Sequence, residues 1–263
     1  MEQQKLSVTV ITCNEEENIR ACLQSVAWAD EIVVVDSGSI DSTIDICREF
    51  TDKVFVNPWE GMKEQKNHAV GRASNLWIFS IDADERVTTE MKEFILREME
   101  HPSHDGYRFR RKNFFLGKWL KHGGWYPDHV LRLFRKDRSS FEGVNPHDKV
   151  VVRTGHVLTT PFHLEHLTYK SISQYVAKQN LYSGISASEK FRLGKVKEVG
   201  IAGIIGRTLW KFAETYLLKA GILDGYYGFV TAIGATYSTF WKYVKIKELA
   251  RRDAAEGGKD LMS

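Results

Sequence analysis

The sequence lacks the features that mark disulfide-stapled, membrane-spanning and disordered chains. Its 263 residues include only three cysteines, an odd number without metal-site spacing, so we expect reduced thiols in a cytosolic protein. No apolar run of about 18 residues without charge occurs, and we expect no helix that crosses a membrane. Residues 1–5 lead directly into a strand-like run, and we expect no secretory leader.

With 43% apolar and 27% charged residues, the composition is that of a globular protein with a full core. The net charge of +3 hides an asymmetry. Residues 1–100 hold 10 Lys/Arg and 20 Asp/Glu, whereas residues 101–263 hold 27 and 14. The acidic first part suits the binding of a metal ion and a nucleotide. The basic remainder indicates an anionic partner or surface, with a solvated basic face as the alternative. We expect no nucleic-acid partner.

The first 82 residues alternate between strand-like and helix-like segments. Uncharged or nearly uncharged β-rich runs predict four strands, and apolar residues at helical spacing predict three helices between them. We place the strands at 6–12, 31–36, 53–56 and 76–82. The first helix would follow Asn14, the second would run from Asp41 or Ser42 to about residue 50, and the third would span 62–73. Asn14 is the expected cap of the first helix and Asp41 or Ser42 that of the second. The alternation predicts a mainly parallel sheet with helices on both faces.

Carboxylates follow several of these strands: Glu15, Asp36, Asp82 and Asp84. Ligands of open α/β sheets bind outside the carboxyl ends of the strands, so we expect these acids to line one site. In an extended chain Asp82 and Asp84 point to the same side. Their oxygens would suit Mg²⁺ or Mn²⁺. A polar turn after a buried strand is the alternative for this pair.

A different pattern begins after a helix at about 88–99. Strand-like alternation returns at 106–111, where one face is basic, at 130–135 and at 150–153. Residues 114–126 are rich in aromatics and glycine, as in a loop that shapes a pocket. We therefore divide residues 1–168, the sheet domain, into a nucleotide-binding half, 1–100, and an acceptor-side half, 101–168.

From about residue 169 the pattern is helical and amphipathic to residue 263. Residues 226–241 form a 16-residue run without charge, rich in aromatics and flanked by lysines and arginines. Such flanks suit helices that lie in a membrane interface. A helical region that packs on itself or on a second subunit, as in a homo-oligomer, is the alternative.

Taken together, the motifs resemble the family 2 glycosyltransferases of the GT-A fold, and among them the bacterial lipopolysaccharide-core β-1,4-glucosyltransferases. The matching stretches are VITCNEE at 10–16, WADEIVVVDSGS at 28–39, NPWEG at 57–61, QKN at 65–67, DADE at 82–85, LRLFR at 131–135 and GILDG at 221–225. Two positions depart. Ile40 replaces a usual Thr, which we interpret as a change in loop packing. Asp148, in Pro146-His147-Asp148, replaces a usual Glu.

The resemblance implies roles for single residues. Asp84 would bind a divalent cation (Mn²⁺ or Mg²⁺) directly, with Asp82 contacting it through water or contacting the ribose. His166, ahead of His163, would complete the metal shell, and a structural histidine is the alternative for both. The nucleotide of a UDP-sugar would be held by residues at the strand ends, namely Thr12, Asn14, Glu15, Asp36 and Lys66. Asp36 suits the uracil N–H and Glu15 a ribose hydroxyl, while a solvated surface lysine is the alternative for Lys66.

An inverting transfer also needs a general base near the acceptor hydroxyl. Asp148 is the first candidate and Asp128 the second, with an Asp in a surface turn as the alternative for each. Four basic residues are candidates to hold phosphates of the acceptor: Arg108, Arg110, Arg111 and Lys112.

The resemblance thus implies a metal-dependent inverting glycosyltransferase. It would move a hexose, glucose from UDP-glucose first, to an inner-core sugar such as heptose of lipopolysaccharide. We expect it at the cytoplasmic face of the inner membrane, bound peripherally. Other envelope glycans are the alternative acceptors. A sugar nucleotidyltransferase fits less well, because the loop after the first strand is acidic and not glycine-rich. A non-catalytic membrane-associated scaffold fits less well, because every expected strand end keeps its acid.

Overall fold

The structure is a computed structural model that describes residues 4–143, 148–194 and 199–257. The chain divides into two compact units. The first unit contains residues 1–113 and 127–168, and the second contains residues 114–126 and 169–263. Residues 114–126, which we predicted as part of the sheet domain, therefore pack with the helices instead.

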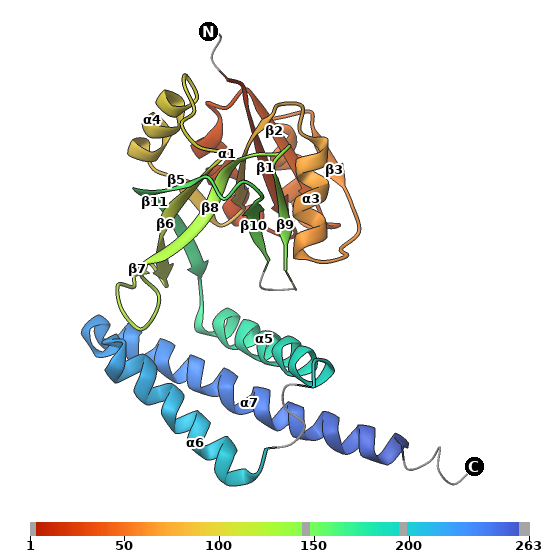
Figure 1. Ribbon diagram of the computed structural model, residues 1–263, viewed down its shortest axis with the longest axis vertical. Helices are drawn as coiled ribbons and strands as arrows, with labels where there is room; N and C mark the ends of the chain where they lie inside the picture. Colours follow the sequence, from red (N-terminus) through yellow and green to blue (C-terminus); the bar gives the residue numbers. More distant parts are fainter. Residues whose placement is uncertain (1–3, 144–147, 195–198, 258–263) are drawn as a thin grey trace. The chain divides into compact units, whose positions relative to one another are not determined.

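The first unit is built on a curled sheet whose first half is parallel (Figure 1). Its strands follow the order β3-β2-β1-β4, with β1 at Leu6–Thr12, β2 at Glu31–Asp36, β3 at Val54–Val56 and β4 at Trp77–Asp82. The connecting helices are α1 (Glu16–Val26), α2 (Thr43–Arg48) and α3 (Met62–Arg72). The predicted alternation of strands and helices is confirmed.

Helices cover both faces of this sheet. Successive residues of each strand point to opposite faces and so join different cores. Val34 joins the larger core with Leu23 of α1 and Ile95 of α4 (Thr89–Glu98). Its neighbour Val33 joins the smaller core, against which Val70 of α3 packs. Two hydrophobic layers therefore hold the strands, and their ends remain available for polar side chains.

The second half of the sheet is mixed and continues from β4 in the order β8-β6-β11-β5, in which the pairs β4–β8, β8–β6 and β11–β5 are antiparallel. These strands are β5 (Glu85–Val87), β6 (Gly106–Phe115), β8 (Asp128–Arg135) and β11 (Val157–Tyr169). The short β7 (Lys118–Trp119) pairs with the end of β6, and β9 (Ser139–Glu142) forms a separate ribbon with β10 (Lys149–Val152). Since β8 runs opposite to β4, the start of β8 lies at the same rim as the end of β4.

The second unit is helical, with α5 (Ile172–Arg192) and α6 (Ile201–Phe212) both beside the long α7 (Gly225–Gly257) (Figure 1). A π-helical turn, η1 (Ala213–Leu218), prolongs α6, and a 3-10 turn, η2 (Gly221–Asp224), leads into α7. Within the ranges that the structure describes, none of the helices has the length and apolar character needed to traverse a lipid bilayer.

Candidate active site

The carboxyl ends of β1, β2 and β4 meet at one rim of the sheet. Thr12 is the register partner of Asp36, and Ile11 is the partner of Asp82. The loops after β1 and β2 are joined by hydrogen bonds, and the Glu15 N–H donates to the Thr43 hydroxyl at 2.8 Å. The strand register therefore brings the strand ends together at one edge, as predicted.

Asn14 connects the two loops and does not cap α1, which corrects our prediction. Its backbone has a positive φ of 52°, a conformation that asparagine tolerates better than most residues. Its N–H donates to the Ser39 hydroxyl at 2.8 Å, and its side-chain oxygen accepts from the Ile40 N–H at 2.9 Å. The Asn14 side chain binds the loop after β2 and not the first turn of α1. Glu15 is the residue that precedes the helix.

Asp36 is completely buried and fixes the loop that follows it. One carboxylate oxygen accepts from the backbone N–H groups of Gly38 (2.8 Å) and Ser39 (2.7 Å), and the other accepts from the Ser39 hydroxyl. Gly38 has a φ of 93°, which favours glycine at this turn. Direct contact with a uracil ring remains a prediction, and it requires the Ser39 hydroxyl to turn away.

Thr12 and Glu15 lie beside this loop. The Thr12 hydroxyl is buried and makes no hydrogen bond within the described residues, an arrangement that costs free energy until a partner arrives. Glu15 accepts a 2.6 Å hydrogen bond from the Asn18 side chain. A polar ligand at this rim would supply the partner that Thr12 lacks, which fits a nucleotide.

Ile40 does not change loop packing, contrary to our interpretation. Its side chain is 94% exposed. The substitution therefore places an apolar group on the surface of the loop after β2 and leaves the loop's hydrogen bonds in place.

Asp82 and Asp84 do not share one strand face, because the chain turns between them. Asp82 ends β4, whereas Asp84 lies in the two-residue turn before β5. Our argument from side chains two apart in an extended chain was wrong for Asp84. The two carboxylates instead have different partners.

Asp82 is held by two cations. Arg132 of β8 forms an ion pair with one oxygen, and Lys66 of α3 lies 3.4 Å from the other. Burial by itself would raise the pKa of Asp82, but the charges of Arg132 and Lys66 outweigh it and hold that pKa well below its usual range. Asp82 is therefore a carboxylate whose negative charge is already compensated.

Lys66 also reaches Asp148, with 3.2 Å between its Nζ and a carboxylate oxygen. The Lys66 side chain is only 8% exposed and that of Asp148 only 5%. Lys66 is thus not the solvated surface lysine of the alternative interpretation, and Asp148 is not in an exposed turn. His147 and Pro146 lie outside the described residues.

A buried carboxylate, Glu85, continues the network. Its side chain is fully buried and pairs with Arg132 and with Arg111, the latter at 3.3 Å. Arg111 binds Asp128 through Nε (2.8 Å) and Nη2 (2.7 Å). Arg111 is therefore engaged by Asp128 and Glu85, and its role toward acceptor phosphates stays a prediction.

Arg108, Arg110 and Lys112 alternate with Arg111 along β6, so they share the other face of the strand. Burial and the positive charges of Lys112 and Arg110 lower the pKa of His163. The predicted basic face of β6 thus consists of these three residues.

His166 lies beside Asp84, with 3.4 Å between Nε2 and a carboxylate oxygen. Its register partner in β5 is Glu85, the residue after Asp84. His163 is three residues earlier in β11, which places its side chain on the opposite face and about 10 Å further along. Between the two histidines, only His166 lies at Asp84.

Asn113 orients the His166 ring. Its Nδ2 donates to Asp128 at 3.2 Å, so its Oδ1 is the atom that accepts from His166 Nδ1 at 2.6 Å. Nδ1 therefore carries a proton, and Nε2 can present a lone pair toward Asp84. Glu85 and Arg132 lie in the DADE and LRLFR motifs, which gave them no role of their own, and no sequence signal singles out Asn113.

The donor set of Asp84 and His166 fits a divalent cation. Two electron-pair donors that face each other at 3.4 Å are held together by a proton or a metal ion between them. No group of three or more His, Cys, Asp or Glu side chains that could hold a metal occurs in residues 4–143, 148–194 and 199–257. Water and phosphate oxygens would have to fill the remaining positions, as is usual for Mg²⁺ in nucleotide sites.

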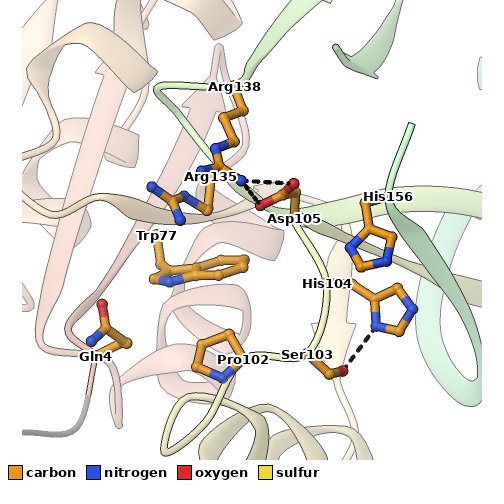
Figure 2. Close-up of a pocket in the computed structure, with 9 residues that line it drawn as sticks. All are labelled: Gln4, Trp77, Pro102, Ser103, His104, Asp105, Arg135, Arg138 and His156. Atoms are coloured by element: carbon orange, nitrogen blue, oxygen red, sulfur yellow. Dashed lines mark hydrogen bonds and ion pairs between the residues drawn. The ribbon is translucent and has the colours of Figure 1, made fainter. Parts of the chain in front are cut away.

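A cavity of about 430 Å³ lies at the other end of the sheet from the rim, beside Trp77 at the start of β4 (Figure 2). Asp105 accepts from Arg138 at 2.8 and 3.0 Å, and His104 stacks on His156 with ring centres 4.6 Å apart. The Thr154 hydroxyl also donates to Asp105. These contacts tie the ends of strands together, and the charges in the cavity are balanced by their neighbours.

A model of the family described as glycosyl transferase family 2 matches residues 7–155, which include the rim residues from Thr12 to Asp148 but not His166. The chain belongs to glycosyl transferase family 2. The family predicted from the motifs is therefore confirmed, and the chain is a glycosyltransferase.

Relatives of this family 2 glycosyltransferase carry matching names. The lipopolysaccharide core biosynthesis glycosyltransferase LpsC of Rhizobium meliloti is 31% identical over 72% of this chain and 73% of its own length. A protein of Rickettsia bellii, named only as an uncharacterized glycosyltransferase, is 30% identical over 94% of this chain and 87% of its own.

Among solved structures, the mannosyltransferase PcManGT from Pyrobaculum calidifontis, in complex with GDP-mannose and Mn²⁺, shares the fold. It aligns with a TM-score of 0.53 and 15% identity over 95% of this chain and 87% of that one. The GT-A fold predicted for the family 2 glycosyltransferase is confirmed.

Proposed function

We propose that this glycosyltransferase transfers a hexose, glucose from UDP-glucose in the first instance, to an inner-core sugar of lipopolysaccharide such as heptose. Transfer would invert the anomeric carbon and use a divalent cation. The observation that carries the proposal is the Asp84–His166 pair, held by Asn113 at the same rim as the loops after β1 and β2. The similarity to LpsC supports a lipopolysaccharide acceptor.

The nucleoside would lie on the loops after β1 and β2. The buried Thr12 hydroxyl needs a partner there, and Glu15 can accept from a ribose hydroxyl. Asp36 holds the loop in shape through Gly38 and Ser39. These residues would select the nucleotide.

Asp84 and His166 would hold the cation, and Asp82 would lie beside it without binding it directly, because Arg132 and Lys66 occupy its carboxylate. When bound, Mn²⁺ or Mg²⁺ supplies a Lewis acid that offsets the charge of the leaving diphosphate. Asn113 keeps the proton on Nδ1 of His166 and so keeps Nε2 available.

Asp148 is the proposed general base. It accepts the proton of the acceptor hydroxyl as that oxygen attacks the anomeric carbon. Its partner Lys66 must move for this step, because an ion-paired carboxylate is a weak base. The diphosphate is an anion to which Lys66 can turn, so donor binding would free Asp148. Asp128 is the weaker candidate, since three donors from Arg111 and Asn113 converge on one of its oxygens.

The acceptor is proposed to carry phosphate at a distance from the reacting sugar. Arg108, Arg110 and Lys112 on one face of β6 would bind it through their positive charges. The phosphorylated inner core of lipopolysaccharide has that chemistry.

A donor and acceptor screen tests the proposal. The full chain is incubated with Mn²⁺, one of UDP-glucose, UDP-galactose, UDP-N-acetylglucosamine or GDP-mannose, and a heptose-terminated core acceptor. We expect UDP release from UDP-glucose only with the acceptor present, and a β-linked product by NMR. Preference for another donor would overturn the choice of glucose. Retention of the α configuration would overturn inversion.

A further inference from the structure

The helical unit exposes an apolar surface that no described residue covers. The surface is formed by α6, η1, η2 and the first half of α7, and we call it the hairpin surface. Its exposed apolar members, each at least 38% exposed, are Ile201, Ile205, Leu209, Trp210, Leu217, Leu218, Ile222, Leu223, Tyr226, Phe229, Ile233 and Phe240. They account for twelve of the twenty exposed large hydrophobic residues in the described part of the chain. Contiguous apolar surfaces of this kind mark binding sites.

The exposed residues follow helical spacing on both helices. Ile201, Ile205 and Leu209 recur every four residues along α6, and the stripe on α7 recurs at intervals of three, four and seven residues. Phe229 on α7 contacts Phe212 and Tyr216, with ring centres 6.3 and 5.9 Å apart. These rings join the two stripes into one surface.

The connection between the helices presents its leucines rigidly. Asp224 is the anchor, since it accepts from the N–H groups of Lys121 and His122 at 3.0 and 2.8 Å. Gly221 and Gly228 approach so closely that a Cβ on Gly228 would meet the Gly221 oxygen at 1.8 Å. Leu218 and Leu223 are therefore 68% and 69% exposed because the turn holds them outward, and not because the turn is loose.

Charge is separated from this surface. The charged residues of α6 and η1 are Arg207, Lys211 and Glu214, which recur at intervals of four and three and so form a stripe of their own. Lys190, Arg207 and Lys242 lie over the ring of Tyr243, at 5.8, 5.1 and 5.0 Å from its centre. Burial and then the charges of Lys190, Lys211 and Arg207 lower the pKa of Lys242, as expected where cations gather.

Carboxylates are too few to compensate these cations. Residues 199–247 contain six Lys/Arg and two acids, Glu214 and Asp224. Glu214 already lies between Lys211 and Lys219, and Asp224 is the anchor of the turn. A second copy of the chain would bring cations against cations, whereas a surface of anionic headgroups would pair with them.

We propose that the hairpin surface docks the chain on an anionic lipid bilayer, with the apolar stripes at the level of the acyl chains and Arg207, Lys211 and Lys242 near the lipid phosphates. An amphipathic helix with aromatic residues and a basic flank binds in this way without crossing the membrane. Docking would bring the enzyme to the membrane surface at which a lipid-linked acceptor is embedded. It does not depend on which sugar is transferred.

Sedimentation with vesicles tests the proposal and uses no sugar substrate. The full chain is mixed with phosphatidylethanolamine–phosphatidylglycerol vesicles or with neutral phosphatidylcholine vesicles. We expect binding to the former and at least about tenfold weaker binding to the latter. Leu217→Glu should weaken binding about tenfold or more. Leu181→Glu on α5 is the matched control, because its side chain is 58% exposed and that of Leu217 is 59%; this variant should bind as the unmodified chain does.

A charge variant and an optical readout separate the two parts of the surface. Arg207→Gln should weaken binding to the anionic vesicles about fivefold and leave binding to neutral vesicles unchanged. Brominated lipids should quench tryptophan fluorescence of the unmodified chain, and Trp210→Phe should remove most of that quenching. Equal binding of Leu217→Glu and Leu181→Glu would overturn the proposal. So would a dimer in ultracentrifugation that Leu217→Glu converts to a monomer while vesicles bind neither form.

Discussion

Nε2 of His166 lies 3.4 Å from a carboxylate oxygen of Asp84, and Nδ1 of the same ring is held at 2.6 Å by the amide oxygen of Asn113. The pair is the last link of a chain of polar contacts that starts at Asp148 and passes through Lys66, Asp82, Arg132, Glu85, Arg111, Asp128 and Asn113. These contacts join the segment just before β10 with α3, β4, β8, β5, β6 and β11 along one rim. Each candidate residue therefore has partners whose replacement can be measured separately.

The Asp84–His166 pair predicts a metal-binding phenotype. His166→Ala and Asp84→Asn should each weaken Mn²⁺ binding, and Asn113→Ala should weaken it about 10- to 100-fold through the loss of ring orientation. Mn²⁺ binding is measured by electron paramagnetic resonance or calorimetry, without any sugar nucleotide. His163→Ala is the control on the same strand. If it weakens binding as much as His166→Ala does, the assignment of His166 is wrong.

Asp148 predicts a separation of catalysis from binding. Asp148→Asn should lower the transfer rate by about 100-fold or more, because the acceptor hydroxyl loses its base. The affinity for UDP should not fall, because Asp148→Asn removes the ion pair that holds Lys66 away from the diphosphate. Rates come from UDP release with acceptor, and affinities from calorimetry. The competing outcome is a rate that survives in Asp148→Asn and collapses in Asp128→Asn, which would transfer the role to Asp128.

The buried hydroxyl of Thr12 predicts opposite effects on stability and binding. Thr12→Val removes a polar atom without a partner, so the free energy of unfolding without ligand should rise by about 1 kcal/mol. UDP affinity should fall about fivefold, because the hydrogen bond to the nucleotide is lost. Thr9→Val is a matched control, since Thr9 lies in the same strand and its hydroxyl is also buried without a partner in the described residues. It should gain stability and bind UDP normally; a loss of UDP affinity in both variants would contradict the role of Thr12.

Glu85 predicts a large loss of stability. Its carboxylate is fully buried between Arg132 and Arg111, and Glu85→Gln removes the negative charge that both share, leaving Arg132 with Asp82 and Arg111 with Asp128. The free energy of unfolding should fall by about 3 kcal/mol or more in urea titrations. Asp137→Asn breaks an exposed pair with Arg135 and should cost less than about 1 kcal/mol. Equal losses would show that the network does not hold the rim together.

Glu31 predicts part of the acid sensitivity of the sheet. Burial alone would raise its pKa, but hydrogen bonds from Lys53, Ser7 and Ser74 outweigh this and lower the pKa to about 2 from an ordinary 4.5. The unfolded chain therefore binds the proton more readily, and stability from Glu31 is present above pH 4.5 and is lost as the pH falls toward 2. Urea titrations between about pH 5 and about pH 2.5 should show a smaller loss for Glu31→Gln than for the unmodified chain. Parallel losses in the two proteins would contradict the assignment.

The sequence by itself determined the parallel half of the sheet and the place of the site. Runs such as residues 6–12 and 31–36 carry no charge between their ends, which is typical of a strand covered by helices on each side. Strand ends then bring polar residues to one rim, because parallel strands end at the same edge. The family followed from motifs in these loops. These inferences depend on local periodicity and on short spacings, which the chain carries in one dimension.

Tertiary structure decided which of these residues face one another. Asp84 does not lie on the predicted strand face, because β4 ends at Asp82 and the chain turns into β5. His166 was separated from His163 by the register of β11 with β5. Asn113, Arg132 and Glu85 became part of the site through contacts between segments distant in sequence. Pairings of this kind depend on strand register and on how charges compensate one another in a buried space, and neither is encoded in the spacing of residues along the chain.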